Sequence, residues 1–166
     1  LTEMFMYHRF NLGILLRIWL LGLISMVSCS GWATDLGTAD DAQRMVEAAL
    51  ARVKTIGPEK AFAEFSSPGS KDAWHHKDVY LFCYRLTGEN ICHGANRALI
   101  GQNLLDLRTP ENQPIIRQMA ELAIKDGQGW VTYKWPHPVT KKIATKRAYV
   151  ARIPGYDGFI GAGIYH

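Results

Sequence analysis

Aromatic and cationic side chains are concentrated in one short segment of the chain. Residues 127–142, GQGWVTYKWPHPVTKK, hold two tryptophans, a tyrosine and three lysines. Side chains alternate between the two faces of a strand, so Tyr133 and Trp135 share one face and Trp130 lies on the other. Lys146 follows on the next expected strand. If Lys146 lies across from Tyr133 and Trp135, a cation sits beside an aromatic wall.

That combination suits a small carboxylate, because an ammonium pairs with the anion, flat apolar walls hold its body and a phenol orients it. The loop between the two strands leaves their register open, and a lysine on a solvated strand is the alternative. Further candidates lie on an earlier hairpin. The candidate ligand-binding residues are Tyr80, Tyr84, His93, Trp130, Tyr133, Trp135 and Lys146. The alternative for the aromatic residues is an ordinary core, and for His93 a structural or exposed imidazole.

No motif in the sequence indicates a metal, a cofactor or catalysis. The histidines include no His-x-x-x-His pair, and the adjacent His75 and His76 would point to opposite faces of an extended segment. The sequence also lacks a G-x-S-x-G elbow, a P-loop and an evident pair of carboxylates. We therefore predict a protein that is not an enzyme and needs no cofactor. An enzyme with unrecognised chemistry is the least favoured alternative.

Residues 1–33 have the pattern of a secretory signal, which leaves 34–166 as a single domain. Arg9 and Arg17 supply positive charge, ILLRIWLLGLISMV is the apolar run, and small residues follow in SCSGWA. A retained membrane anchor and lipid attachment at Cys29 are the alternatives. Removing Glu3, Arg9 and Arg17 with the signal leaves 17 basic and 14 acidic residues, a net charge of +3. With no long basic run, nucleic acid is not expected as a partner.

Two cysteines lie beyond that signal, Cys83 and Cys92, within YLFCYRLTGENICHG. The segment is typical of two strands joined by a tight turn at Thr87-Gly88. A two-residue turn there pairs 86 with 89, 85 with 90, 84 with 91 and 83 with 92. The cysteines then face each other, so we predict a disulfide, which an exported protein can keep oxidised. Two free core thiols are the alternative.

The remaining patterns predict where helices and strands lie. Residues 38–57 form an amphipathic helix that Thr38 can cap, and a short helix follows from Pro58. A further helical segment covers 110–127. Strands are expected at 77–86, 90–94, 129–135, 144–154 and 159–166. Helices outside a run of hairpin-linked strands indicate an α+β fold. We expect a PAS-like antiparallel sheet of about five strands with the long N-terminal helix packed against it.

Long stretches of the chain match a known pattern. They are GPEKAFAEF, DVYLFCYRLTGENICHGANRALIGQNLLDLRTPENQPIIRQM, GQGWVTYKWPHPVTKKIATKRAYV and IGAGIY, which span nearly all of residues 38–165. Together they resemble the single Cache domain, type 2, of bacterial extracellular sensors. The resemblance implies a PAS-like fold that holds a small extracellular solute, often an organic acid, on one sheet face, and it supports Lys146 as a pocket residue. Members occur in chemoreceptors and histidine kinases. Cys83 and Cys92 depart from the pattern, which has apolar residues there.

These observations favour an exported sensory domain, and the end of the chain at His166, directly after the last expected strand, favours a stand-alone form. It would bind a small carboxylate or similar metabolite and contribute to signal transduction through a membrane receptor, kinase or transporter. The alternative is a ligand-free structural module that docks on a transporter or sensor kinase. Lys146 separates the two hypotheses. A buried lysine beside aromatic side chains in a real cavity favours ligand binding, and a solvated lysine over a filled core favours docking.

Overall fold

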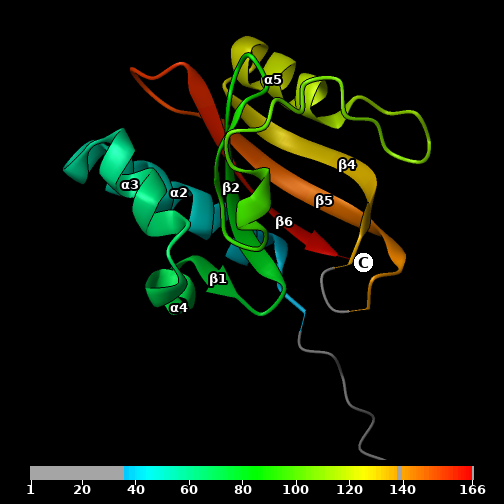
Figure 1. Cartoon of the computed structure of the whole chain (residues 1–166), viewed down its shortest axis with the longest axis horizontal. Coiled ribbons are helices and arrows are strands. Elements are labelled where there is room, and N and C mark those ends of the chain that lie inside the picture. Colours follow the sequence, from blue (N-terminus) through cyan, green and yellow to red (C-terminus); the bar gives the residue numbers. More distant parts are fainter. Residues whose placement is uncertain (1–35, 138–139, 166) are drawn as a thin grey trace, which may run out of the picture. The chain divides into compact units, whose positions relative to one another are not determined.

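The computed structural model describes residues 36–137 and 140–165 (Figure 1). The signal predicted for residues 1–33 lies outside them. In the described part of the chain, strands form one antiparallel sheet with helices on both of its sides. The predicted α+β, PAS-like class is therefore confirmed. Among the described residues, no helix combines the length and the apolar character that crossing a membrane requires.

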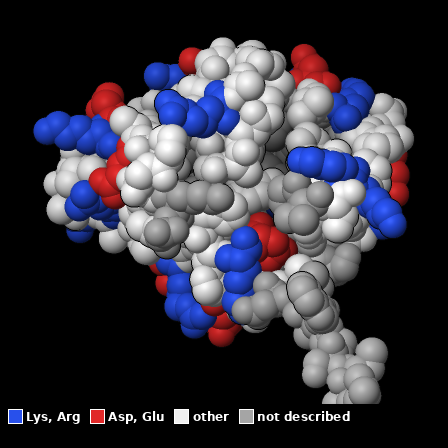
Figure 2. Space-filling view, turned by 60° about the horizontal axis from the view of Figure 1, so that its bottom comes forward, with Lys and Arg blue, Asp and Glu red and all other residues white. Residues whose placement is uncertain are grey.

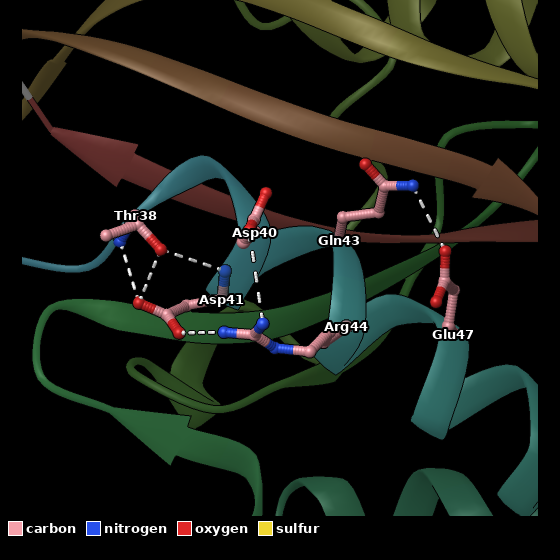
Figure 3. Close-up of polar contacts among 6 residues, drawn as sticks. All are labelled: Thr38, Asp40, Asp41, Gln43, Arg44 and Glu47. Carbon is pink, nitrogen blue, oxygen red and sulfur yellow. Dashed lines mark hydrogen bonds and ion pairs between the residues drawn. The ribbon is translucent and has the colours of Figure 1, made fainter.

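Helix α2, Ala39–Ile56, is the long N-terminal helix, and polar contacts hold its first turn (Figure 3). The Asp41 carboxylate accepts hydrogen bonds from the backbone N–H and from the hydroxyl of Thr38. In return, the hydroxyl oxygen of Thr38 accepts a hydrogen bond from the backbone N–H of Asp41. Arg44 pairs with the same carboxylate at 2.8 Å. The hydrogen bonds from Thr38, supported by Arg44, hold the pKa of Asp41 well below its usual range. The helix therefore begins at a charged cap that favours its N-terminal dipole.

Three shorter helical segments follow α2. They are α3 (Pro58–Phe65), η1 (Pro68–Ser70) and α4 (Lys71–Trp74). Glu64 of α3 links this helix to α2 and α4, because its carboxylate accepts hydrogen bonds from the Arg52 guanidinium and from the indole N–H of Trp74. This side of the domain is thus one packed layer of helices.

The sheet has six strands in the described residues, one more than predicted, because a two-residue strand precedes the hairpin. The strands are β1 (His75–His76), β2 (Val79–Arg85), β3 (Asn90–His93), β4 (Gln128–Pro136), β5 (Ile143–Arg152) and β6 (Gly158–Tyr165). Their order is β1-β2-β6-β5-β4, with β3 also paired to β2. Strand β6 runs through the middle, and all eight of its residues are buried. Each of the two sheet faces therefore carries its own core.

The two cores differ in what covers them. Leu81 and Cys83 of β2 face the layer of α2 and α3, whereas Tyr80, Phe82 and Tyr84 face α5 (Ile115–Lys125). Figure 1 shows α2 and α3 on one side of the sheet and α5 on the other. This alternation, which follows from the two-residue period of a strand, collects the tyrosines on the α5 side.

Helix α5 begins later than the sequence pattern predicted. The expected helical segment was 110–127, but the helix starts at Ile115, directly after Pro114. A proline has no backbone N–H to donate, and it disfavours the helical conformation in the residue before it. Residues 110–114 consequently belong to the long connection that follows η2 (Arg97–Leu99) and leads to α5.

The β2–β3 hairpin confirms the predicted disulfide and corrects the turn beside it. The Arg85 N–H donates to the Glu89 carbonyl, so the loop holds three residues rather than two, with Gly88 at a φ of 93°. Tyr84 therefore pairs with residue 90, and the predicted pairs 86–89, 85–90 and 84–91 are wrong. An extra residue at position 91 forms a bulge that restores the pairing of Cys83 with Cys92. The two cysteines form a disulfide with a Cα–Cα distance of 4.8 Å.

Charged side chains lie in small groups of both signs on the face shown in Figure 2. Exposed ion pairs in the described part of the chain include Arg85 with Glu89 and Arg117 with Asp106. Exposed pairs of this kind contribute little to stability. The functionally informative charge is instead a buried one.

Candidate ligand-binding site

A pocket lies between the sheet and α5. Its walls are Tyr80, Phe82, Tyr84, His93, Ile115, Ile116, Met119, Tyr133, Trp135 and Lys146. About 300 Å³ lies between these walls, solvent at the mouth included. Only a small part of that space is wide enough for a water-sized sphere, roughly enough for one ordered water. A bound solute would therefore require the helix and the sheet to move apart slightly.

Lys146 is the central polar group of this pocket. The β4–β5 register places it directly opposite Tyr133, so the cation and the aromatic wall share a face as the sequence pattern required. Its side chain is buried, with a relative exposure of 1%. The ammonium Nζ donates a hydrogen bond of 2.6 Å to the Tyr80 hydroxyl. It also lies 3.9 Å from the centre of the Tyr80 ring and 5.0 Å from that of Tyr165.

Two glycines of β6 make room for these side chains. A Cβ on Gly163 would lie 2.4 Å from Cε of Lys146, and a Cβ on Gly161 would lie 2.4 Å from the Phe82 ring. Both distances are shorter than any non-bonded carbon contact. The Gly-Ala-Gly run therefore leaves the space in which the lysine stem and the phenyl ring lie.

Burial and the ammonium set the protonation of the surrounding phenols. Burial by itself would raise the pKa of Tyr80. The positive charge of Lys146 and the hydrogen bonds to Lys146 and Tyr165 lower this pKa by more, so it lies below its ordinary value. Burial raises the pKa of Tyr84 to about 12 and that of Tyr133 well above 10. Tyr84 and Tyr133 are consequently neutral near pH 7 and present O–H groups that can donate to an anion.

His93 presents a second kind of donor. Its Nδ1 accepts hydrogen bonds from the backbone N–H groups of Ala95 at 3.2 Å and Asn96 at 2.9 Å. In the neutral ring the proton must therefore be on Nε2. Burial, and secondarily the Lys146 charge, lowers the pKa of His93 to about 4. The ring is thus a neutral N–H donor near pH 7, in a wall that already holds a cation.

The depressed pKa of His93 predicts a pH dependence of folding. Its pKa is about 4 in the folded protein against an ordinary 6.5, so its contribution to stability is fully present above pH 6.5 and is lost as the pH falls toward 4. We expect the free energy of unfolding to fall by about 2–3 kcal/mol between pH 7.5 and 4.5 through this residue. Urea denaturation across that range measures it.

The matched variants are His93→Asn, which keeps an acceptor for the two backbone N–H groups, and His76→Asn on an exposed position. In His93→Asn the free energy of unfolding should depend less on pH, and in His76→Asn its pH dependence should match the wild type. An equally steep loss of stability in His93→Asn would assign the effect to other groups.

Six of the seven predicted ligand-binding residues line this one pocket: Tyr80, Tyr84, His93, Tyr133, Trp135 and Lys146. Trp130 does not. It lies on the opposite sheet face, 5.2 Å from the Tyr149 ring and 4.4 Å from the Arg147 guanidinium. The reason is the two-residue alternation of β4, which separates Trp130 from Tyr133.

The remaining walls come from residues that the sequence did not single out as ligand contacts. Phe82 lies between the two predicted tyrosines of β2. Ile115 and Met119 belong to the apolar stripe of α5, which periodicity indicated as core without showing which sheet face it covers. Tyr165 completes the surroundings of the ammonium from the last strand.

Asp78 connects the edge of this site to both ends of the domain. Its buried carboxylate accepts hydrogen bonds from the backbone N–H groups of Gly37 at 2.5 Å and Tyr165 at 3.3 Å. Gly37 directly precedes the cap of α2, and Tyr165 is the last residue of β6. A Cβ on Gly37 would overlap the Val79 side chain at 2.1 Å, so this close approach requires glycine. No local pattern in the sequence indicated this contact.

Comparison with known proteins decides the family. A family model described as Cache domain (dCache_2) matches residues 40–166. This chain belongs to the Cache family. The predicted resemblance is thereby confirmed.

Curated relatives of this Cache domain are signalling proteins. The sensor histidine kinase MctS of Rhizobium johnstonii is 36% identical over 89 residues, which are 54% of this chain and 19% of the kinase. The methyl-accepting chemotaxis protein McpP of Pseudomonas putida is 31% identical over 88 residues, 53% of this chain and 16% of the receptor. The chain thus spans less than a fifth of the length of these relatives.

Solved structures share the fold. A methyl-accepting chemotaxis protein from Vibrio parahaemolyticus superposes with a TM-score of 0.63 and 22% identity, covering 76% of this chain and 86% of that chain. A structure described as the basis for carboxylic acid recognition by a Cache chemosensory domain gives the same TM-score and identity, over 76% and 91%. These solved structures therefore show the same fold as this Cache domain.

Proposed function

We propose that this Cache domain binds a small organic carboxylate in the pocket between the sheet and α5, with Lys146 as its counter-ion. The observation that carries the proposal is the isolation of that ammonium. It is 1% exposed, and among the described residues it contacts a phenol and aromatic rings but forms no ion pair with a carboxylate. A buried charge without a partner costs several kcal/mol. An anionic ligand would supply the partner.

The rest of the pocket suits the same ligand. The His93 Nε2–H and the Tyr133 hydroxyl are neutral donors, which can bind carboxylate oxygens that the ammonium leaves free. Ile115, Ile116 and Met119 offer an apolar surface to the carbon chain. A lysine buried beside aromatic residues also favours ligand binding over a docking module, and the small cavity beside it would have to widen around a ligand.

Occupancy would bias the packing of α5 against the sheet, because the closed pocket must open to admit a solute. The curated relatives, a histidine kinase and a chemotaxis receptor, support a role in signal transduction through a membrane partner. The solved Cache domain described for carboxylic acid recognition supports the ligand class. With the predicted signal at 1–33, the proposal places the domain in the periplasm or outside the cell, anchored to the membrane if that segment is retained.

A thermal-shift comparison of acids with their amides tests the proposal. The purified protein is screened with acetate, propionate and butyrate, and with acetamide, propionamide and butyramide, which have the same shape without the charge. An acid at a hundred times its dissociation constant should stabilise the domain by about 2.7 kcal/mol, or several degrees. Equal shifts with acids and amides, or no shift on folded protein, would contradict the carboxylate proposal.

A further inference from the structure

The ammonium of Lys146 already has a polar contact, and this contact lies at the pocket wall. Its Nζ donates a hydrogen bond of 2.6 Å to the Tyr80 hydroxyl, and both residues line the pocket. Lys146 is 1% exposed and Tyr80 is 3% exposed. In the empty domain the phenol oxygen therefore takes a place at the ammonium that a carboxylate oxygen of the ligand would also need.

Aromatic rings enclose the ammonium. Nζ lies 3.9 Å from the centre of the Tyr80 ring, 5.0 Å from that of Tyr165 and 5.8 Å from that of Phe82. Tyr80 and Phe82 belong to the pocket wall, and Tyr80 is the closer of the two. A ligand in the pocket therefore approaches the ammonium from the side that Tyr80 covers.

The pocket leaves no room for a carboxylate beside this contact. Its free space holds about one ordered water, which is less than a carboxylate with its carbon chain requires. Movement of α5 would widen the pocket near Ile115 and Met119. Lys146 and Tyr80, however, both belong to the sheet, on β5 and β2, so a shift of the helix leaves their contact in place. An ammonium has three N–H groups, but a carboxylate reaches them here only if the Tyr80 hydroxyl moves aside.

The Tyr80 hydroxyl has a second neighbour that allows this exchange. The Tyr165 phenol is within hydrogen-bonding reach of it, and their contact shifts the pKa of both groups. Tyr165 is itself held, because its hydroxyl donates to the Pro136 carbonyl at 3.1 Å. A displaced Tyr80 hydroxyl would keep this neighbour, while the ammonium exchanges a neutral acceptor for an ionised one, which binds it more strongly.

We infer that Tyr80 is an internal competitor of the ligand. Its hydroxyl binds the Lys146 ammonium in the empty domain and yields that position to the carboxylate when an acid binds. The contact is autoinhibitory, because it lowers the affinity for acids and keeps the pocket closed at low ligand concentration. This inference rests on the proposed function, since it assumes that Lys146 is the counter-ion of the ligand.

Tyr80→Phe tests the inference, because it removes the hydroxyl and keeps the ring. The empty variant loses the hydrogen bond to the ammonium, whereas the complex has already given it up. Calorimetry with acetate, propionate and butyrate should therefore give dissociation constants at least about tenfold lower than in the wild type, the effect of one hydrogen bond to a charged group. Tyr149→Phe is the matched control. Tyr149 is buried in the core that faces α2, so its hydroxyl should not affect the binding of acids.

Thermal melting gives a second readout on the same variant. Without acid, Tyr80→Phe should melt below the wild type, because the buried ammonium loses its polar contact. At an acid concentration far above both dissociation constants this difference should disappear, because neither complex contains the contact. The comparison separates a bond that exists only in the empty domain from one that is kept in both states.

Every other outcome overturns the inference. Unchanged affinity, with a lower melting temperature in both the empty and the saturated variant, would make Tyr80 a structural residue. Weaker binding would make its hydroxyl a direct donor to the ligand, as proposed for Tyr133. Both of these results leave the carboxylate site standing. If the wild type binds none of the three acids, or binds their amides equally well, the proposed function falls and the inference falls with it.

Discussion

Replacing Lys146 with methionine is expected to abolish carboxylate binding and to leave the empty domain at least as stable as the wild type. Removing one partner of a buried ion pair costs about 3–5 kcal/mol, so the affinity should fall by at least about 100-fold. The ammonium forms no ion pair within the described residues, so the unliganded protein loses one hydrogen bond to Tyr80 and the cation–π contacts with the Tyr80 and Tyr165 rings. An apolar side chain of similar length in a buried site is neutral or stabilising. Calorimetry with the acid that gives the largest thermal shift, together with urea denaturation, measures both quantities.

Lys134 provides the control for this experiment. It lies on β4, on the sheet face opposite Lys146, and its Nζ donates to the Thr145 hydroxyl at 2.7 Å. Lys134→Met should leave the affinity unchanged, although it also removes a lysine from the sheet. Unaltered affinity in Lys146→Met would refute the carboxylate proposal. A large drop in its stability would instead make Lys146 a structural residue.

Loss of the Cys83–Cys92 disulfide should lower the free energy of unfolding by about 2–3 kcal/mol, because the bridge closes a loop of roughly ten residues in the unfolded chain. For a domain of this size that corresponds to a melting temperature roughly 10 °C lower. The double variant Cys83→Ala/Cys92→Ala and the reduced wild type should both show the loss. Both cysteines are fully buried. Reductant should therefore act slowly on the folded protein and faster once it unfolds.

The double variant is also the control. It has no Cys83–Cys92 bridge for a reductant to break, so reductant should not change its melting temperature. Identical unfolding free energies for the wild type with and without reductant would show that the thiols are free in solution. Phe82, Tyr84 and His93 flank the bridge and line the pocket. Ligand affinity of the double variant therefore reports how far the bridge holds those side chains in place.

Alternation along strands was the most useful information in the sequence. It correctly placed Tyr133 and Trp130 on opposite faces of the sheet. It also predicted that Lys146 would lie beside Tyr133 and Trp135 if the two strands paired in the right register, which they do. The register itself depends on the loop between β4 and β5, whose conformation no local pattern determines. The hairpin shows a related limit. Cys83 and Cys92 are paired as predicted, but only because a longer turn and a bulge offset each other.

Residues whose role depends on distant contacts were not predicted. Asp78 receives its hydrogen bonds from residues 41 and 87 positions away in the sequence. Long-range packing, rather than local propensity, creates this contact.

The contact of Gly37 and Tyr165 with one carboxylate also bears on how such a domain is used in larger proteins. The described domain therefore begins and ends beside the same side chain. A module with coincident entry and exit can be inserted at a single site of a host protein without separating the host residues on either side. Asp78 holds these two ends of the described domain together.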